Sequence, residues 1–260
     1  MPASFPETDF RAFGIAAHAF FPDIYTFKGL QEVLYDLQEK KRQFDWSWPA
    51  VRYRYRSCTE CNDEFKALLN DETSDWWKAG GHDEELVYKL ERCIYQFFTS
   101  ALSVFDSFAF CLYFYGNAVE PGAFVEVGNP RAITRNATAK AFTAAFPQAG
   151  ITGLLAGLSK DSRFSTIDMV RNLVGHRISG RRSIRSSVTL QADGGYTTDL
   201  HEETWHLPGA AGKLTFDEEM LQRHLDDVTV LLASLSLAAR EFADAQKTAR
   251  KPLAEAKHEH

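Results

Sequence analysis

DEELVYKLERCIYQFFTSALSVFDSFAFCLYFY, residues 83–115, is the stretch that decides the fold. Its apolar side chains recur in steps of three and four along the whole stretch: Leu86, Leu90, Ile94, Phe97, Ala101, Phe105, Phe108 and Leu112. Such steps keep side chains on one face of a helix that has 3.6 residues per turn. We therefore predict a long amphipathic helix that Gly116-Asn117 closes.

The rest of the chain shows further helical patterns. We expect helices over 26–44, 59–69, 135–146, 149–159, 162–176 and 215–247. Prolines at positions 2, 6 and 22 predict an irregular start over 1–25, and Trp48-Pro49 is expected to break the pattern. Residues 52–56 alternate arginine with tyrosine, which fits either a short strand or a turn.

Residues 183–207 follow a different period. Apolar and polar residues alternate there around the turn signal Asp193-Gly194-Gly195, a pattern typical of a β-hairpin. The predicted fold class is all-α, a helical bundle with an inserted β-hairpin near 183–207. We expect an N-terminal helical extension over 1–80, the bundle with its hairpin over 81–249 and a disordered tail over 250–260.

Composition and charge restrict the class of protein. Of 260 residues, 45% are hydrophobic and 25% charged, which is typical of a globular protein in water. A net charge of -6 argues against a protein coated with nucleic acid, although it permits a local basic patch. Residues 93–115 are long enough to span a membrane, but they include Asp106 and several hydroxyl side chains, so we expect no membrane span. With no secretory signal in the first residues, the expected localisation is cytoplasmic.

Four cysteines are present, and two of them, Cys58 and Cys61, form a C-x-x-C pair. A structural zinc site needs four ligands, and no second pair stands at a suitable spacing. We therefore expect reduced thiols, no metal and no cofactor.

The string Arg171-Asn172-Leu173-Val174-Gly175-His176 points most directly to a chemistry. Asn172 lies four residues before His176, so the two share a face of a helix. Arg171 and His176 would point about 140° apart on an ideal helix. A shared site therefore needs a long arginine reach, a helix that ends at Gly175, or a second subunit.

More arginines follow this string, at Arg177, Arg181, Arg182 and Arg185. Five arginines within fifteen residues, in a chain of negative net charge, predict a local patch that attracts anions such as RNA phosphates.

The same string resembles the signature of HEPN domains, in which an arginine, a polar residue that is often asparagine, a few further residues and a histidine occur late in an all-helical bundle. The resemblance implies that Arg171 and His176 are catalytic residues and that Asn172 is their polar companion. It also implies a homodimer that acts on RNA or a nucleotide without a metal, in many members as a toxin or defence ribonuclease that an antitoxin or other partner protein can restrain.

The implied chemistry is physically reasonable. RNA carries its own nucleophile, the 2′-hydroxyl, and an imidazole with a pKa near 6.5 can accept or donate the proton. The guanidinium of arginine matches phosphate oxygens and can stabilise the pentavalent transition state.

Other interpretations of these residues remain open. The chain could be a non-catalytic module that binds a nucleotide or a protein, or a purely structural bundle in which Arg171 pairs with Asp106. Asp106 could instead be a supporting carboxylate of the site, and His176 could cap a helix end. The aromatic residues Trp46, Trp48, Tyr53 and Tyr55, interspersed with Arg52, Arg54 and Arg56, could stack bases, but packing against the bundle is favoured.

Overall fold

The structure is a computed structural model that describes residues 4–20, 31–75, 84–124, 129–175, 181–191, 194–206, 214–215 and 219–255. Its helices are α1 (Glu7–Phe20), α2 (Gln31–Asp75), α3 (Glu84–Val119), α4 (Arg135–Ala145), α5 (Gly150–Gly157), α6 (Ser162–Gly175) and α7 (Met220–Glu255). Short 3-10 turns lie at Pro121–Ala123, Pro130–Ala132 and Leu158–Lys160. The predominance of helix confirms the all-α class.

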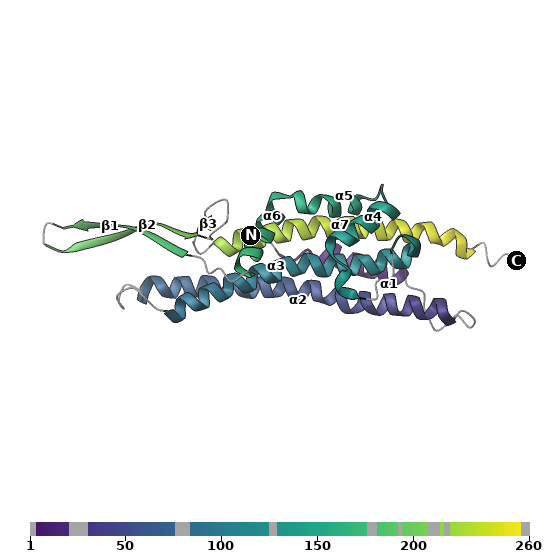
Figure 1. Ribbon diagram of the computed structural model, residues 1–260, viewed down its shortest axis with the longest axis horizontal. Helices are drawn as coiled ribbons and strands as arrows, with labels where there is room; N and C mark the ends of the chain where they lie inside the picture. The colour runs from purple at the N-terminus through teal and green to yellow at the C-terminus, as the bar shows by residue number, and fades with distance from the viewer. Residues whose placement is uncertain are drawn as a thin grey trace.

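Three long helices, α2, α3 and α7, lie lengthwise side by side and form an elongated bundle (Figure 1). The shorter helices α4, α5 and α6 cover one side of it, and α1 packs on α7. One aromatic core joins these parts, because the ring of Phe13 on α1 contacts the rings of Phe44 on α2 and of Phe108 and Tyr115 on α3. The N-terminal helices therefore share the core of the bundle.

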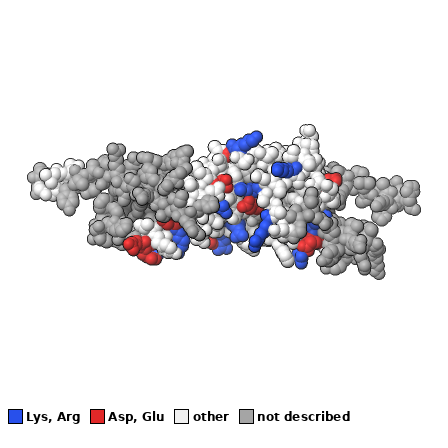
Figure 2. Space-filling model, in the orientation of Figure 1, with Lys and Arg blue, Asp and Glu red and all other residues white. Residues whose placement is uncertain are grey.

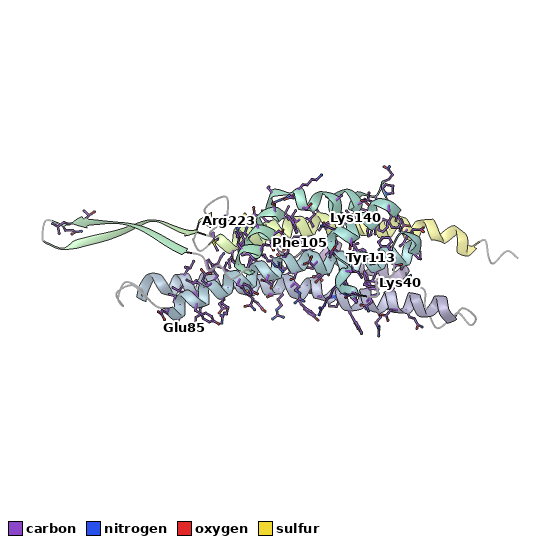
Figure 3. The ribbon with its side chains drawn as sticks, in the orientation of Figure 1. Lys40, Glu85, Phe105, Tyr113, Lys140 and Arg223 are labelled. Atoms are coloured by element: carbon purple, nitrogen blue, oxygen red, sulfur yellow. The ribbon has the colours of Figure 1, made fainter. Side chains whose placement is uncertain are left out.

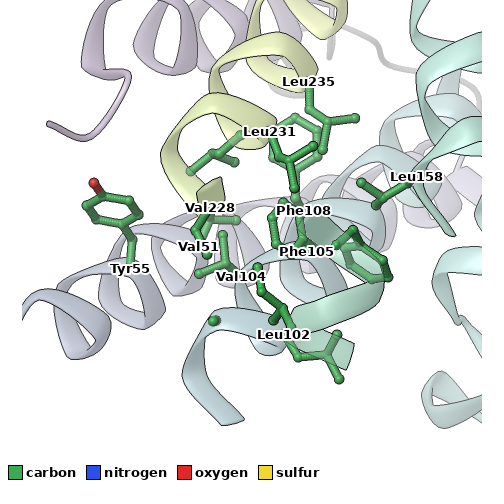
Figure 4. Packing of buried hydrophobic residues seen from close by; sticks show 14 of the residues in the cluster. Val51, Tyr55, Leu102, Val104, Phe105, Phe108, Leu158, Val228, Leu231 and Leu235 are labelled. Atoms are coloured by element: carbon green, nitrogen blue, oxygen red, sulfur yellow. The ribbon is translucent and has the colours of Figure 1, made fainter. Parts of the chain in front are cut away.

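The stripe of α3 is buried as its spacing predicts. Ile94, Phe97, Phe105 and Phe108 each expose 1% or less of their surface. Figure 4 shows Val104, Phe105 and Phe108 of α3 packed against Val228, Leu231 and Leu235 of α7. Burial of this apolar surface from both helices is the main force that holds them together.

The helix boundaries around α3 correct one prediction. Gly116 does not end the helix, which continues to Val119. A Cβ at Gly116 would overlap the ring of Phe124, so the glycine serves close packing rather than helix termination.

The N-terminal third also differs from prediction. Residues 7–20 are helical rather than irregular, and Pro6 stands just before the helix, where a missing N–H costs nothing. α2 passes through Pro49 without ending, so residues 52–56 are neither strand nor turn. Buried side chains recur in steps of three, four and seven on both sides of the proline, at Phe44, Val51, Tyr55, Cys58 and Phe65. Their packing against α1 and α3 outweighs the hydrogen bond that Pro49 removes.

At the other end of the chain, α7 extends to Glu255 and so includes the first residues of the predicted disordered tail. Residues 256–260 lie outside the described part of the chain.

Strands β1 (Arg181–Leu190) and β2 (Tyr196–His206) pair antiparallel and project from one end of the bundle (Figure 1). The register shifts between Arg185 and Ser186, which is a β-bulge. Gly194 adopts a φ of 84° at the turn, a left-handed conformation that favours glycine. A short third strand, β3 (Leu214–Thr215), pairs with β2.

Candidate functional site

α6 carries the arginine of the sequence motif and is anchored by its apolar face. Phe164, Ile167 and Val170 are buried, and Val174 is half-buried. The helix begins after Asp161, whose Oδ1 accepts a hydrogen bond of 2.9 Å from the Arg163 amide, as an N-cap does. This arrangement leaves Arg171 exposed on the outer side of α6.

Arg135, at the start of α4, is the centre of a cluster of charged residues beside α6. Its Nε lies 2.9 Å from Oδ1 of Asp106 on α3, and a terminal nitrogen lies 3.8 Å from Oδ1 of Asp168 on α6. The guanidinium carbon also lies 4.5 Å from the ring centroid of Phe164, a cation–π contact. Arg135 thereby ties α3, α4 and α6 together. We call Asp106, Arg135, Asp168 and Arg171 the charged cluster.

Phe164 connects this cluster to the core. Its ring meets the ring of Phe105 edge to face, with centroids 5.3 Å apart. Phe105 lies on α3 in the part of the bundle that α6 covers (Figure 3). Since Asp106 follows Phe105 directly, the packing of Phe105 fixes the backbone from which this carboxylate extends.

The pKa of Asp106 is raised above its ordinary value. Loss of water around the carboxylate is the main cause, and the negative charge of Asp168 adds to it, while Arg135 and Arg171 act in the opposite direction. Arg171 therefore acts on Asp106 through space. Among the described residues, the ion pair of Asp106 is with Arg135, so the interpretation of Arg171 as its salt-bridge partner is wrong.

Arg171 itself makes one hydrogen bond among the described side chains: its Nη1 donates to Oδ1 of Asn172 at 3.0 Å. No carboxylate of the described residues lies within ion-pair distance of it. Asn172 is half-buried and so steadies the guanidinium beside it. The cation remains accessible to a ligand from solvent.

Gly175 is the last residue of α6, but it does not adopt a positive φ. The helix therefore ends at Gly175 as predicted, but without the left-handed conformation that commonly terminates a helix. A Cβ at this position would have nothing within 4 Å of it.

Several predicted site residues are not placed in full. His176 and Arg177 lie outside the described residues, so the distance from His176 to Arg171 stays untested. Arg181, Arg182 and Arg185 lie on β1, where Arg185 stands opposite Glu202 in the strand register. Figure 2 shows basic and acidic side chains interleaved over the middle of the visible face.

Sequence reasoning missed Arg135. Nothing in its local sequence marks it, because its contacts come from α3 and α6, which are distant in sequence. The one available signal was Asp106 itself, a carboxylate in a long apolar helix that needs a cationic partner.

The aromatic residues of α2 divide into two groups. Tyr55 is 5% exposed and Trp48 stacks on Phe10 with ring centroids 3.5 Å apart, so these two pack as expected. Trp46 and Tyr53 are 65% and 68% exposed, and for them the packing interpretation is wrong.

All four cysteines are buried and unpaired. Burial raises the pKa of Cys93 and of Cys111 to about 12 and raises those of Cys58 and Cys61 as well, so the thiols hold their protons. Within the described ranges, no group of three or more His, Cys, Asp or Glu side chains could hold a metal ion. α3 is the described helix that is long and apolar enough to cross a membrane, and 67% of its most apolar window is buried inside the protein.

No protein-family model, curated protein or solved structure matches the chain.

Proposed function

We propose that this protein is a HEPN-like, metal-independent endoribonuclease. The observation that carries the proposal is the accessible guanidinium of Arg171, which lies one turn before the end of α6 and has no carboxylate partner among the described residues. An arginine held in a partly buried ion pair, such as Arg135, would bind a phosphate weakly, whereas Arg171 is exposed and available.

In the proposed reaction, the 2′-hydroxyl of a ribose attacks the adjacent phosphorus. His176 accepts the hydroxyl proton, and a protonated group, His176 itself or water, supplies a proton to the leaving 5′-oxygen. Arg171 stabilises the added negative charge on the phosphate oxygens, and Asn172 holds Arg171 in place through its amide oxygen. The products are a 2′,3′-cyclic phosphate and a free 5′-hydroxyl.

The other residues of the charged cluster influence how strongly Arg171 can bind a phosphate. Because Arg135 pairs with Asp106 and Asp168, it offsets part of their negative charge. Arg171 is consequently free to bind a phosphate, although Asp106 and Asp168 remain close enough to oppose a second negative charge.

The resemblance further suggests a homodimer, in which a second copy could bring His176 to Arg171, and a partner protein such as an antitoxin that restrains the activity. Both belong to the proposal and are testable by the mass of the purified protein and by co-expression.

The alternative is a non-catalytic HEPN-like module that binds a nucleotide or a protein. The observation that favours it is the balance of charge in the cluster, where two carboxylates offset two arginines and so weaken the stabilisation of a transition state.

The test compares wild type, His176→Ala and Arg171→Ala on end-labelled RNA in EDTA, with Arg131→Ala as the matched control. Arg131 is an exposed arginine whose side chain makes no contact in the cluster. We expect the His176 variant to lose about 10²–10⁴-fold in rate and the control to keep wild-type activity. Absence of cleavage by wild type, or equal cleavage by all variants, would rule out the ribonuclease; changed binding without cleavage would support the alternative.

A further inference from the structure

A groove of about 820 Å³ lies between the N-terminal segment with α1 on one side and the middle of α2 on the other. It shares no residue with the charged cluster. The proposed ribonuclease chemistry does not use it, and its lining combines aromatic rings with arginines.

The floor of the groove is rigid. The rings of Phe10 and Trp48 stack with an interplanar angle of 7°. Gly14 lets the indole approach α1 closely, because a Cβ there would lie 2.9 Å from two ring carbons of Trp48. The hydroxyl of Tyr55 is fixed by a hydrogen bond of 2.7 Å with Thr229 on α7. A ligand would therefore meet a preformed surface.

The edges of the groove are exposed and apolar. Tyr53 on α2 is 68% exposed, and Ile15 on α1 is 60% exposed. Neither side chain contributes to the buried core of the bundle. Tyr53 thus offers an aromatic face on which a planar group could stack.

Three arginines line the same groove: Arg11, Arg52 and Arg56. Arg52 pairs with Glu7 at 3.6 Å and Arg56 with Glu60 at 2.7 Å, and both pairs are exposed, so a phosphate could displace the carboxylates at little cost. Among the described residues Arg11 has no ion pair. Glu7 is the one carboxylate among the described lining residues, so the three arginines leave the lining cationic. Burial lowers the pKa of His18, so this side chain adds no positive charge to that balance at neutral pH.

We propose that this groove binds a segment of single-stranded RNA, with a base stacked on Tyr53 and the phosphates bound by Arg11, Arg52 and Arg56. A cationic groove lined by aromatic rings is the combination that single-stranded nucleic acid uses. A simple anion would leave the aromatic face unused, and an apolar helix from a partner protein would bury the arginines without counter-charge. The choice of RNA rests on the proposed function, but the binding does not require cleavage.

The test is fluorescence anisotropy with a labelled oligouridylate of about 12 nucleotides, in EDTA and on a His176→Ala background so that the probe is not consumed. The variants are Tyr53→Ala and the double substitution Arg52→Ala with Arg56→Ala. The matched controls are Tyr88→Ala, an exposed tyrosine on α3, and Arg131→Ala, since both lie outside the groove.

We expect Tyr53→Ala to weaken binding about tenfold, within the range measured for the loss of one stacking contact. The double substitution should also reduce the slope of log affinity against log salt by about 1.4, since each phosphate contact contributes about 0.7. The controls should bind as the parent does, and thermal melting should show that all variants are folded.

Failure of the parent to bind the oligonucleotide at low salt would overturn the proposal, and so would equal affinities of groove and control variants. Binding lost only with Arg171→Ala would do the same, because the strand would then lie on the charged cluster. Groove-dependent binding by a protein that cleaves no RNA would support this inference while overturning the proposed function.

Discussion

In the charged cluster where α3, α4 and α6 meet, Arg135 lies over the ring of Phe164 and forms ion pairs with two carboxylates of the protein. In the groove between α1 and α2, arginines also lie beside aromatic rings, but they remain exposed. Arg135 has 24% of its side chain exposed, against 77% for Arg56. An arginine beside an aromatic ring therefore does not by itself mark a binding site, because the guanidinium must also remain exposed to a ligand.

The largest expected effect is on the free energy of unfolding, and it distinguishes the floor of the groove from its edges. Trp48→Ala removes an indole that contacts Phe10, Phe13 and Phe44, and we expect it to lower the free energy of unfolding by about 4 kcal/mol. Tyr53→Ala, at the edge, should change it by less than about 0.5 kcal/mol. Urea denaturation of both variants measures the difference, and equal losses would show that Tyr53 belongs to the core after all.

A second prediction concerns a largely buried group outside both regions, His224. Burial, followed by the charge of Arg223, lowers the pKa of His224 on α7 from 6.5 to about 4. In the unfolded chain His224 binds a proton near pH 6.5, but in the folded protein it stays neutral until about pH 4. The free energy of unfolding is therefore highest above pH 6.5 and falls as the pH is lowered. The total loss is about 3 kcal/mol once the pH is below both values.

His224→Gln cannot titrate and should flatten this dependence between pH 6.5 and about 4. Chemical denaturation of wild type and variant over that range measures the effect. The same acid sensitivity in both proteins would assign it to other groups.

A third prediction sharpens the structural role of Arg135. Arg135→Met keeps an apolar side chain over Phe164 but loses the ion pair to Asp106 and the cation–π contact. Since both carboxylate partners are partly exposed, we expect a loss of about 1–2 kcal/mol in unfolding free energy. An unchanged melting temperature would mean that Arg135 does not hold the three helices together.

The smallest expected effect is at Gly175. Its φ is not left-handed and a Cβ has open space, so Gly175→Ala should stabilise the protein by about 0.5 kcal/mol through better helix propensity. Calorimetry would detect the change. A lower melting temperature would indicate that the chain needs the freedom of glycine to continue beyond α6.

Sequence patterns predicted those parts of the fold that depend on local periodicity. The steps from Leu86 to Leu112 define α3 because one face of a single helix meets the core. The prolines misled in two places, because α1 begins directly after Pro6 and α2 continues through Pro49. Packing on α1 and α3 compensates for Pro49, and the buried positions on either side of this proline could have indicated the continuous helix.

The candidate site was predictable in part. Arg171 donates a hydrogen bond to Asn172 and acts on Asp106 through space, and the sequence singled out all three. Their pairing was not predictable, because Arg135 reaches Asp106 from another helix and replaces Arg171 as its partner. Such exchange depends on how α4 crosses α3, which no local pattern encodes.

The proposed role of Arg171 is tested by a paired measurement on Arg171→Ala: its melting temperature and its rate of RNA cleavage in EDTA, each relative to wild type. We predict an unchanged melting temperature and a cleavage rate lowered at least about 100-fold, because the proposed role of Arg171 is to bind phosphate and its described contact with the protein is one exposed hydrogen bond to Asn172. Retained cleavage, or a loss of cleavage that only accompanies unfolding, would contradict the account.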